Sequence, residues 1–239
     1  MVKLIKLIYY LLPIKLQCLI RSASGIGLLK IGKGSYVHQS THILGKAHIV
    51  IGSNSCLSEG CWLNINHRYE KKNTIQIGNN CFIGKQNFFS SGDAIVVGDY
   101  TLTTIGCKFI GSSHVIDNPL IPYLLSGTTC DDRIQIGVNC FFGAGCTVMG
   151  NVKIGHGSVI GAESLVLRDI PPFSVAIGNP AQVVKRYSFH KEAWLLASEI
   201  SSYDESLMPN EVEYLAKLKS KYSKINLPWI AAGKSMGDL

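Results

Sequence analysis

The chain has 239 residues, of which 46% are hydrophobic and only 16% charged, a composition that excludes a largely disordered protein. The formal net charge of +7 favours acidic partners such as phosphates, acidic polysaccharides or an anionic membrane surface, but no lysine and arginine cluster with interleaved aromatic residues supports nucleic-acid binding. The eight cysteines form no C-x-x-C pair, which argues against a zinc ribbon or a thioredoxin-type site and indicates buried, reduced thiols in a cytoplasmic protein.

Residues 1–24, MVKLIKLIYYLLPIKLQCLIRSAS, form an apolar segment with interspersed basic residues. The basic residues and Pro13 argue against a membrane-spanning helix, and no convincing signal-peptide cleavage site follows. Two interpretations stay open. The segment is either a short helical cap on the first coil of the fold or a basic amphipathic helix that makes peripheral contact with the inner membrane face.

Residues 25–186 repeat in hexads, which is typical of a parallel β-helix. An aliphatic-Gly dipeptide recurs six times, and apolar residues follow each aliphatic residue at six and twelve positions, with Thr103 as the exception. The dipeptides are Ile31-Gly32, Ile51-Gly52, Ile77-Gly78, Val97-Gly98, Ile136-Gly137 and Ile154-Gly155. Three short strands per turn give a triangular coil, so we expect an all-β core of about six stacked coils.

The fifth position of each hexad mostly holds a small residue, which fits a tight corner between two strands. These residues are Ser35, Thr41, Ala47, Ser55, Cys61, Cys81, Thr101, Cys107, Ser113, Cys140, Cys146, Ser158 and Ser164. Five of the eight cysteines occupy this position, so we interpret them as core-filling side chains.

The spacing between coils predicts two long insertions. The second and third coils begin 26 residues apart instead of 18, which places a loop near residues 67–74. The fourth and fifth begin 39 residues apart, which places about 21 extra residues near 111–133. Long excursions from a regular scaffold are usually functional.

Residues 187–239 are expected to form a C-terminal helical extension that caps or braces the β-helix. Ala193, Leu195 and Leu196 suggest one helix over residues 189–201. A second is predicted from Asn210 to about Tyr222, with Glu213 completing a capping box.

Two histidines lie where loops leave the scaffold. His67 stands where the shorter insertion begins, and His114 opens the longer one in FIGSSHVIDNP. A histidine at the edge of a rigid scaffold, next to a long loop, is well placed to act as a general base.

Residues 75–186 resemble the sugar acetyltransferase branch, the galactoside and maltose acetyltransferases, of the hexapeptide-repeat superfamily, whose β-helices are left-handed. The segment IVVGDYTLTTIGCKFIGSSH is similar to the one that ends in that branch's catalytic histidine, which matches His114. FIGKQNFFSSGD resembles the segment with an acceptor-binding asparagine and aspartate, which match Asn87 and Asp93. Both residues occupy the small-residue position, so their larger polar side chains need an explanation. The alternative for Asn87 is that its side chain only forms hydrogen bonds within the corner and contacts no acceptor.

The stretch from DIPP through GNPA-x-VVK resembles the signature of acetyl-CoA users in this superfamily. The resemblance implies that Ala144 and Ala162 offer backbone N–H groups to the pantetheine arm. It also implies that Arg168, Lys185 and Arg186 meet the CoA phosphates. The family often has tryptophan where this chain has Phe141, so an indole hydrogen bond would be lost there.

Taken with the residues, the resemblance implies a metal-independent acetyltransferase that uses acetyl-CoA as co-substrate and forms a homotrimer. His114 would be the base in direct transfer to a sugar hydroxyl of a capsule, a lipopolysaccharide or a precursor, in the cytoplasm or at the inner membrane face.

Three alternatives stay open. The first is N-acetylation of a nucleotide-linked amino sugar, and the second is a non-catalytic scaffold. The third, a metal-dependent lyase like the γ-type carbonic anhydrases, is disfavoured because His38 and His42 lie in the first coil, far from His114.

Overall fold

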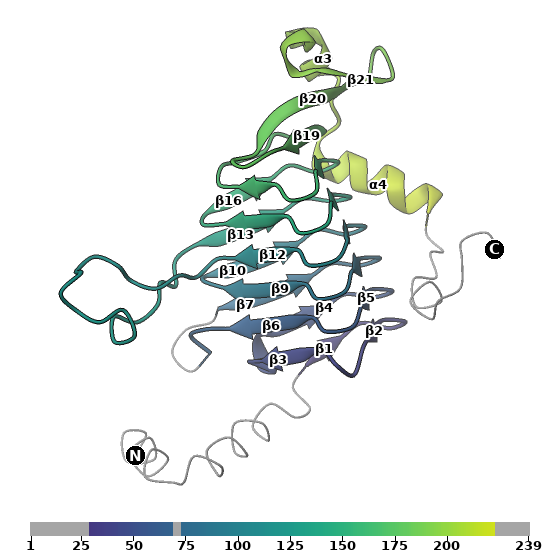
Figure 1. Cartoon of the computed structure of the whole chain (residues 1–239). Helices are drawn as coiled ribbons and strands as arrows, with labels where there is room; N and C mark the ends of the chain where they lie inside the picture. Colours follow the sequence, from purple (N-terminus) through teal and green to yellow (C-terminus); the bar gives the residue numbers. More distant parts are fainter. Residues whose placement is uncertain (1–28, 69–72, 223–239) are drawn as a thin grey trace.

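The computed structural model describes residues 29–68 and 73–222 (Figure 1). The N-terminal segment that was predicted to cap the fold or to contact a membrane, residues 1–24, lies outside the described residues. In the ranges that the structure covers, no helix is both long and apolar enough to span a bilayer.

Short parallel strands stack into three sheets that form the faces of a prism (Figure 1). Sheet 1 contains β1 (Lys30–Ile31), β4 (Ile49–Ile51), β7 (Thr74–Ile77), β10 (Ala94–Val97), β13 (Arg133–Ile136) and β16 (Val152–Ile154). Sheet 2 begins with β2 (Tyr36–Val37), β5 (Cys56–Leu57), β8 (Phe82–Ile83), β11 (Leu102–Thr103), β14 (Phe141–Phe142) and β17 (Val159–Ile160), and ends with β19 (Ser174–Ile177), β20 (Gln182–Ser188) and β21 (Ala193–Leu196). Sheet 3 contains β3 (His42–Leu44), β6 (Trp62–Ile65), β9 (Phe88–Ser91), β12 (Lys108–Ile110), β15 (Thr147–Met149) and β18 (Leu165–Val166). In every coil a turn leads from sheet 1 to sheet 2, a second from sheet 2 to sheet 3, and a third from sheet 3 to sheet 1 of the next coil. We call these turns the 1–2, the 2–3 and the 3–1 corner.

The hexad pattern is explained by the strand register. In sheet 1, Ile77 pairs with Val97 and Val97 with Ile136, so the aliphatic residue before each glycine stacks on its equivalent in the next coil. From the second coil on these side chains point inward and are at most 2% exposed, whereas Ile31 in the first coil is 47% exposed. Thr103, the exception in the pattern, is also fully buried, and its Oγ1 accepts a hydrogen bond from Gly84 N at 3.1 Å. The predicted parallel β-helix is therefore confirmed, and left-handed winding stays a prediction.

Small residues are needed at the corners because their side chains bond to the backbone of the next coil. Ser55 Oγ donates to Gly78 O at 2.7 Å, Cys61 Sγ to Gly84 O at 3.1 Å, and Cys140 Sγ to Gly155 O at 3.3 Å. Each bond satisfies the carbonyl of the glycine that follows an aliphatic residue. The five corner cysteines are buried in the same way, so we assign them a structural role.

Thiol labelling tests this assignment. Burial raises the pKa of the Cys61 thiol to about 11 and that of the Cys81 and Cys140 thiols to about 12. At pH 8 these thiols stay protonated, and we expect a thiol reagent to leave them unmodified in the native protein. Cys130, which is partly exposed on the long loop, should react before these three. Peptide mapping by mass spectrometry reads each cysteine separately, and modification of Cys81 as fast as Cys130 would contradict the expectation.

The helix predicted over residues 189–201 is wrong. β20 and β21 pair antiparallel and continue sheet 2 beyond β19. A short 3₁₀ turn, η2 (Ala197–Glu199), and a single α-helical turn, α3 (Ser202–Ser206), come next. The last coil exposes unpaired backbone at β19, and this hairpin satisfies it. Tyr187 and Trp194 pack across the hairpin with ring centroids 5.4 Å apart. β20 also runs through the boundary that was expected at residue 186.

The second predicted helix is confirmed as α4 (Glu211–Lys221). Asn210 Oδ1 accepts from Glu213 N at 3.0 Å, and Glu213 Oε2 accepts from Asn210 N at 3.2 Å, which is the expected capping box. The helix packs along the 1–2 corner (Figure 1), where Glu211 Oε1 accepts from Val138 N at 2.8 Å and Lys219 Nζ lies 3.5 Å from Asp99 Oδ2. α4 therefore braces the last coils and covers one corner of the prism.

Candidate functional site

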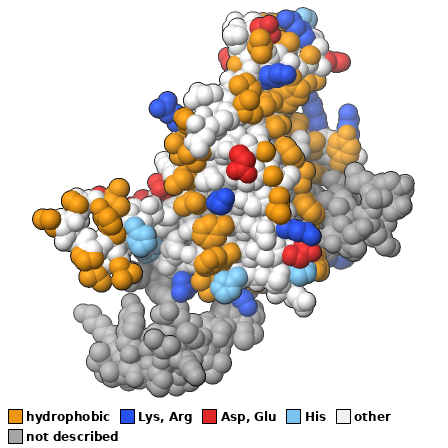
Figure 2. Space-filling view, in the orientation of Figure 1, with side chains coloured by type: hydrophobic (Ala, Val, Ile, Leu, Met, Phe, Trp, Pro, Cys, Tyr) orange, Lys and Arg blue, Asp and Glu red, His pale blue; other side chains and the backbone are white. Residues whose placement is uncertain are grey.

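The longer insertion, residues 111–132, projects from the 3–1 corner between β12 and β13 (Figure 1). Its base is a two-stranded stem in which Thr129 N donates to Ser113 O at 2.7 Å and Val115 N donates to Gly127 O at 3.1 Å. Its tip is apolar and open to solvent, with Leu120 90% and Leu124 87% exposed, and Figure 2 shows a largely hydrophobic surface on this loop. Exposed apolar surface of this kind marks a contact region.

His114 lies in this stem, opposite Thr128 in an antiparallel bridge. Its side chain is exposed, and within residues 29–68 and 73–222 no side chain forms a hydrogen bond with its imidazole. A base must reach a proton on another molecule, so an accessible imidazole on a backbone that hydrogen bonds hold in place is suited to this role.

His67 meets the same stem from a different coil. It follows β6 at the 3–1 corner, and its Nε2 lies 3.0 Å from Thr128 Oγ1. The sequence singled out His67 only for its position at the start of a loop. Its contact with the stem that carries His114 could not be predicted, because it depends on how two separate insertions meet.

Asn87 and Asp93, predicted to bind the acceptor, lie at different corners. Asn87 has no exposed surface at the 2–3 corner, where its Nδ2 donates to Thr104 O at 2.7 Å and to Gly84 O at 2.9 Å. These bonds hold the amide nitrogen of Asn87 in the corner, whereas its Oδ1 is buried with no hydrogen-bond partner among the described residues. Its contact with the acceptor stays a prediction. Asp93 is exposed at the 3–1 corner, where its backbone N–H donates to Asp132 O at 2.8 Å and its carboxylate accepts from Arg133 Nη1 at 3.1 Å. Asp93 and His114 therefore border the same loop base.

Ala144 and Ala162 lie one above the other at the 2–3 corner, linked through Glu163 N, which donates to Ala144 O at 2.8 Å. The neighbouring N–H groups are used between coils, as in Gly143 N to Ile160 O at 2.8 Å. Among the described residues, none accepts a hydrogen bond from the N–H of Ala144 or Ala162. Within that part of the chain, the N–H groups of Ile105 and Lys85, at the same corner in earlier coils, also have no acceptor. The corner therefore presents a column of available donors, which suits the amide-rich arm expected there.

The three predicted phosphate-binding cations lie at different places in the structure. Neighbouring residues of a strand point to opposite faces, so Lys185 and Arg186 diverge. Lys185 is exposed on the outer face of sheet 2, whereas Arg186 has a side chain only 13% exposed that forms an ion pair with Glu205. Arg186 is thus engaged by the C-terminal cap in this structure, and contact with the CoA phosphates would require this ion pair to open. Arg168 is exposed beyond β18, at the 3–1 corner and across sheet 3 from Ala162.

The donor column and His114 are also separated within one chain. They stand at opposite edges of sheet 3, because Ala144 lies at the 2–3 corner and His114 at the 3–1 corner. The segment from Ile105 to His114 spans up to about 30 Å at about 3.3 Å per residue. A small molecule that touches both features must extend across sheet 3 or lie between two copies of the chain.

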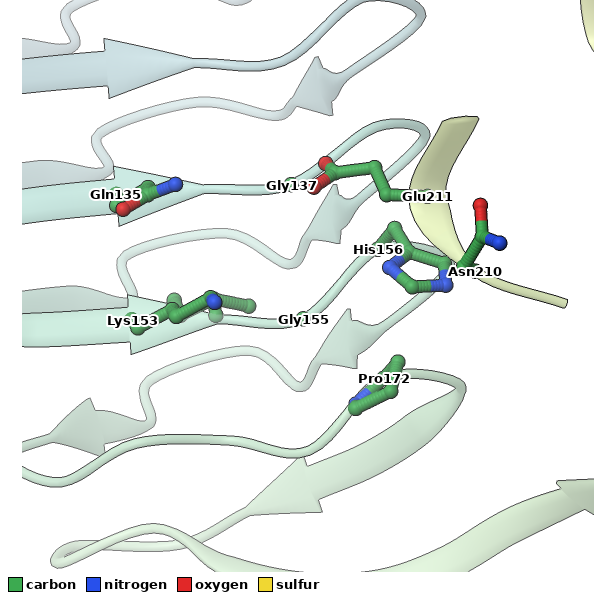
Figure 3. A pocket seen from close by; sticks show the side chains of 9 residues that line it. Gln135, Gly137, Lys153, Gly155, His156, Pro172, Asn210 and Glu211 are labelled. Atoms are coloured by element: carbon green, nitrogen blue, oxygen red, sulfur yellow. The ribbon is translucent and has the colours of Figure 1, made fainter. Parts of the chain in front are cut away.

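A pocket of about 270 Å³ lies at the 1–2 corner, away from both features. Figure 3 shows the Glu211 side chain reaching from the start of α4 toward Gly137, with the His156 ring beside Asn210. Glu211 is engaged by Val138 N, and His156 Nε2 lies 3.0 Å from Pro209 O. These groups join α4 to the coils, so the pocket belongs to the interface between α4 and the β-helix. In the described ranges, no three His, Cys, Asp or Glu side chains are grouped to hold a metal ion.

Comparisons with known proteins agree with this architecture. Residues 133–168 match the family model described as bacterial transferase hexapeptide (six repeats). A Staphylococcus aureus protein described as an acetyltransferase is 36% identical over 112 residues, which cover 47% of this chain and 55% of the relative. The chain thus spans about half the length of such relatives. The N-acyltransferase AntD from Bacillus cereus, solved with dTDP and coenzyme A, has the same fold with a TM-score of 0.59 and 20% identity, covering 71% of this chain and 90% of AntD.

A Lysinibacillus sphaericus protein described as a macrolide acetyltransferase is matched over more of its length than the Staphylococcus aureus relative. It is 30% identical over 155 residues, which cover 56% of this chain and 86% of the relative. Together with the six-repeat match and the stacked coils, this relative shows that the chain belongs to the hexapeptide-repeat acetyltransferases.

Proposed function

We propose that the chain is an acetyl-CoA-dependent acetyltransferase that acetylates a hydroxyl of a sugar in a surface polysaccharide or its precursor. The observation that carries this proposal is the exposed His114 on a hydrogen-bonded stem at one edge of sheet 3, with available backbone donors at the other edge. The family membership supports acetyl transfer, and the sugar acceptor rests on the sequence resemblance around His114.

In this mechanism the His114 imidazole takes the proton from the acceptor hydroxyl while the hydroxyl oxygen attacks the thioester carbonyl. A carbon–oxygen bond forms, and the tetrahedral intermediate collapses with cleavage of the carbon–sulfur bond. The CoA thiolate leaves and regains a proton, so no covalent enzyme intermediate is needed. Backbone N–H groups near the carbonyl stabilise the oxyanion.

The co-substrate would lie along the 2–3 corner. The N–H groups of Ala144 and Ala162 would bind amide carbonyls of the pantetheine arm, and Lys185 would meet the phosphates. Lys185 pairs with Val175, which continues the outer column of Phe141 and Val159 on sheet 2. It therefore faces the same side of the molecule as the adjoining corner. Arg168 would contact the phosphates from the 3–1 side.

Replacing Lys185 with alanine should raise the Kd for acetyl-CoA by about 3- to 10-fold, because one exposed charge-assisted contact is lost. Titration calorimetry with acetyl-CoA and with its dephospho form would show whether the 3′-phosphate is the group involved. The matched control is Arg186→Ala, which should leave this Kd unchanged and lower the unfolding midpoint, because it frees Glu205. A larger rise in Kd for Arg186→Ala than for Lys185→Ala would contradict the assignment.

We also propose that the protein acts as a homotrimer. One copy holds the donor column and His114 on opposite edges of sheet 3, so a neighbouring copy can complete a site by bringing its corner beside the stem. The exposed Leu120 and Leu124 at the loop tip supply apolar surface for such a contact.

The acceptor is tested by following CoA release from acetyl-CoA with a thiol reagent. One set of acceptors contains capsule or lipopolysaccharide fragments, a second contains nucleotide-linked amino sugars, and a third contains macrolides, because a relative is described as acting on them. Release that requires a polysaccharide fragment supports the proposal. Release only with an amino sugar would assign N-acetylation instead, and failure to bind acetyl-CoA would refute acetyl transfer.

A further inference from the structure

His67 and the longer insertion meet at the 3–1 corner. His67 begins the shorter insertion after β6, and Thr128 belongs to the returning strand of the longer one. His67 Nε2 and Thr128 Oγ1 are 3.0 Å apart. This side-chain contact spans 61 positions in the sequence and joins the second coil to the loop of the fourth.

Thr128 is also the residue that faces His114 across the stem. Side chains of directly opposed residues in an antiparallel pair lie on the same face, with Cβ atoms about 4.5–5.5 Å apart. The Thr128 hydroxyl therefore stands on the same side of the stem as the His114 imidazole. His67 contacts that side, so the side chains of His67, Thr128 and His114 lie in this order on one face of the stem.

The two ends of the insertion are bonded to the scaffold, where Gly111 N donates to Ser90 O at 2.8 Å and Asp93 N donates to Asp132 O at 2.8 Å. Ser112 Oγ donates to Thr129 O at 2.7 Å and Ser113 N donates to Thr129 Oγ1 at 3.0 Å, but these bonds join the two strands of the stem to each other. Beyond the stem the loop tip is largely exposed. The contact with His67 ties the stem to a neighbouring coil, which limits how far the stem and its histidine can swing.

We infer that His67 is a positioning residue for the reaction: through Thr128 it fixes the stem that directs the His114 imidazole toward the acceptor. The catalytic part of this inference rests on the proposed function, whereas the effect on the stem does not. A displacement of about 1 Å at a reacting group can cost roughly 100-fold in rate. A single hydrogen bond far from the co-substrate can thus change kcat strongly and leave acetyl-CoA binding intact.

The test compares His67→Ala, His67→Gln, Thr128→Val and the double variant of His67→Ala with Thr128→Val. We expect His67→Ala to lower kcat by about 10- to 100-fold with an unchanged KM for acetyl-CoA. Glutamine places an amide nitrogen near the position of Nε2, so His67→Gln should recover most of the rate. Thr128→Val should match His67→Ala, and the double variant should be no slower than either single variant, because all three remove the same contact.

A second measurement does not depend on activity. Hydrogen exchange of the stem amides, Val115 and Thr129, should become faster in His67→Ala and return toward the wild-type rate in His67→Gln. The control is His190→Ala, an exposed histidine of the C-terminal cap that contacts Tyr203, which should change neither exchange nor rate.

The outcomes separate the two proposals. Faster stem exchange in a protein that acetylates no acceptor would retain the structural role of His67 and reject the proposed function. Unchanged exchange together with an unchanged rate in His67→Ala would overturn the inference. A slow His67→Ala beside a fully active Thr128→Val would also overturn it, because His67 would then act without Thr128.

Discussion

Replacing His114 with alanine should lower kcat for acetyl transfer by about 100- to 10,000-fold, the range that a general base contributes. The variant loses the group that accepts the acceptor's proton, so the hydroxyl must attack while still protonated. The Kd for acetyl-CoA should stay within about twofold of the wild-type value, because the donor column lies at the other edge of sheet 3.

Because His114 is exposed, its replacement should change the rate without changing the stability of the fold. No core contact is removed, so the circular dichroism spectrum and the unfolding midpoint should be unchanged. His38→Ala is the matched control, because His38 lies in the first coil and contacts Ser40 and Tyr36. A His114→Ala variant that keeps more than about a tenth of the wild-type kcat would remove His114 from the role of base.

The repeat carried enough information to predict the scaffold. The aliphatic-Gly spacing sets which residues stack, and the register of Ile77, Val97 and Ile136 follows it directly. A stacked coil places equivalent positions above one another, so a local pattern determines long-range contacts. The capping box at Asn210 and Glu213 was predictable for a related reason, because both of its residues lie within one turn of the helix.

The hairpin of β20 and β21 was missed because its signal is not local. Leu195 and Leu196 fit a short helix as well as a strand, and what decides between the two is the unpaired edge of β19. Arg186 was assigned to the CoA phosphates from its motif, but the sequence does not show that Glu205 folds back to pair with it. In both cases the deciding partner comes from outside the segment that suggested the prediction.

The candidate site shows the same difference between local signals and contacts made by distant residues. The matched motif pointed to His114, which opens an insertion in the repeat, and its catalytic role stays a proposal. Asn87 was singled out as too polar for its corner, where its Nδ2 donates to Gly84 O and Thr104 O and its Oδ1 has no hydrogen-bond partner among the described residues. The role of His67 needed the contact between two insertions, and insertions have no repeat from which their positions can be derived.

Replacing Phe142 with alanine should lower the free energy of unfolding by about 3–5 kcal/mol. Its side chain is fully buried in sheet 2, stacked between Thr103 and Ile160 in the adjoining coils. Its ring meets that of Phe109 edge to face, with centroids 5.2 Å apart. Alanine leaves a cavity at the centre of the prism that the hydrogen-bonded coils cannot close, and the loss is a large part of the roughly 5–15 kcal/mol that stabilises a typical domain.

Phe141→Ala is the matched control, because the same residue type on the same strand points outward and is 37% exposed. We expect it to cost less than about 1 kcal/mol in a dilute sample. Urea unfolding at several protein concentrations separates the two roles of this strand. A deficit at Phe142 should not depend on concentration, whereas a deficit at Phe141 that grows with concentration would come from an interface between copies. The packing predicts a larger loss in the free energy of unfolding for Phe142→Ala than for Phe141→Ala. Equal losses at every concentration would contradict it, because the inward or outward direction of a side chain on β14 would then not determine stability.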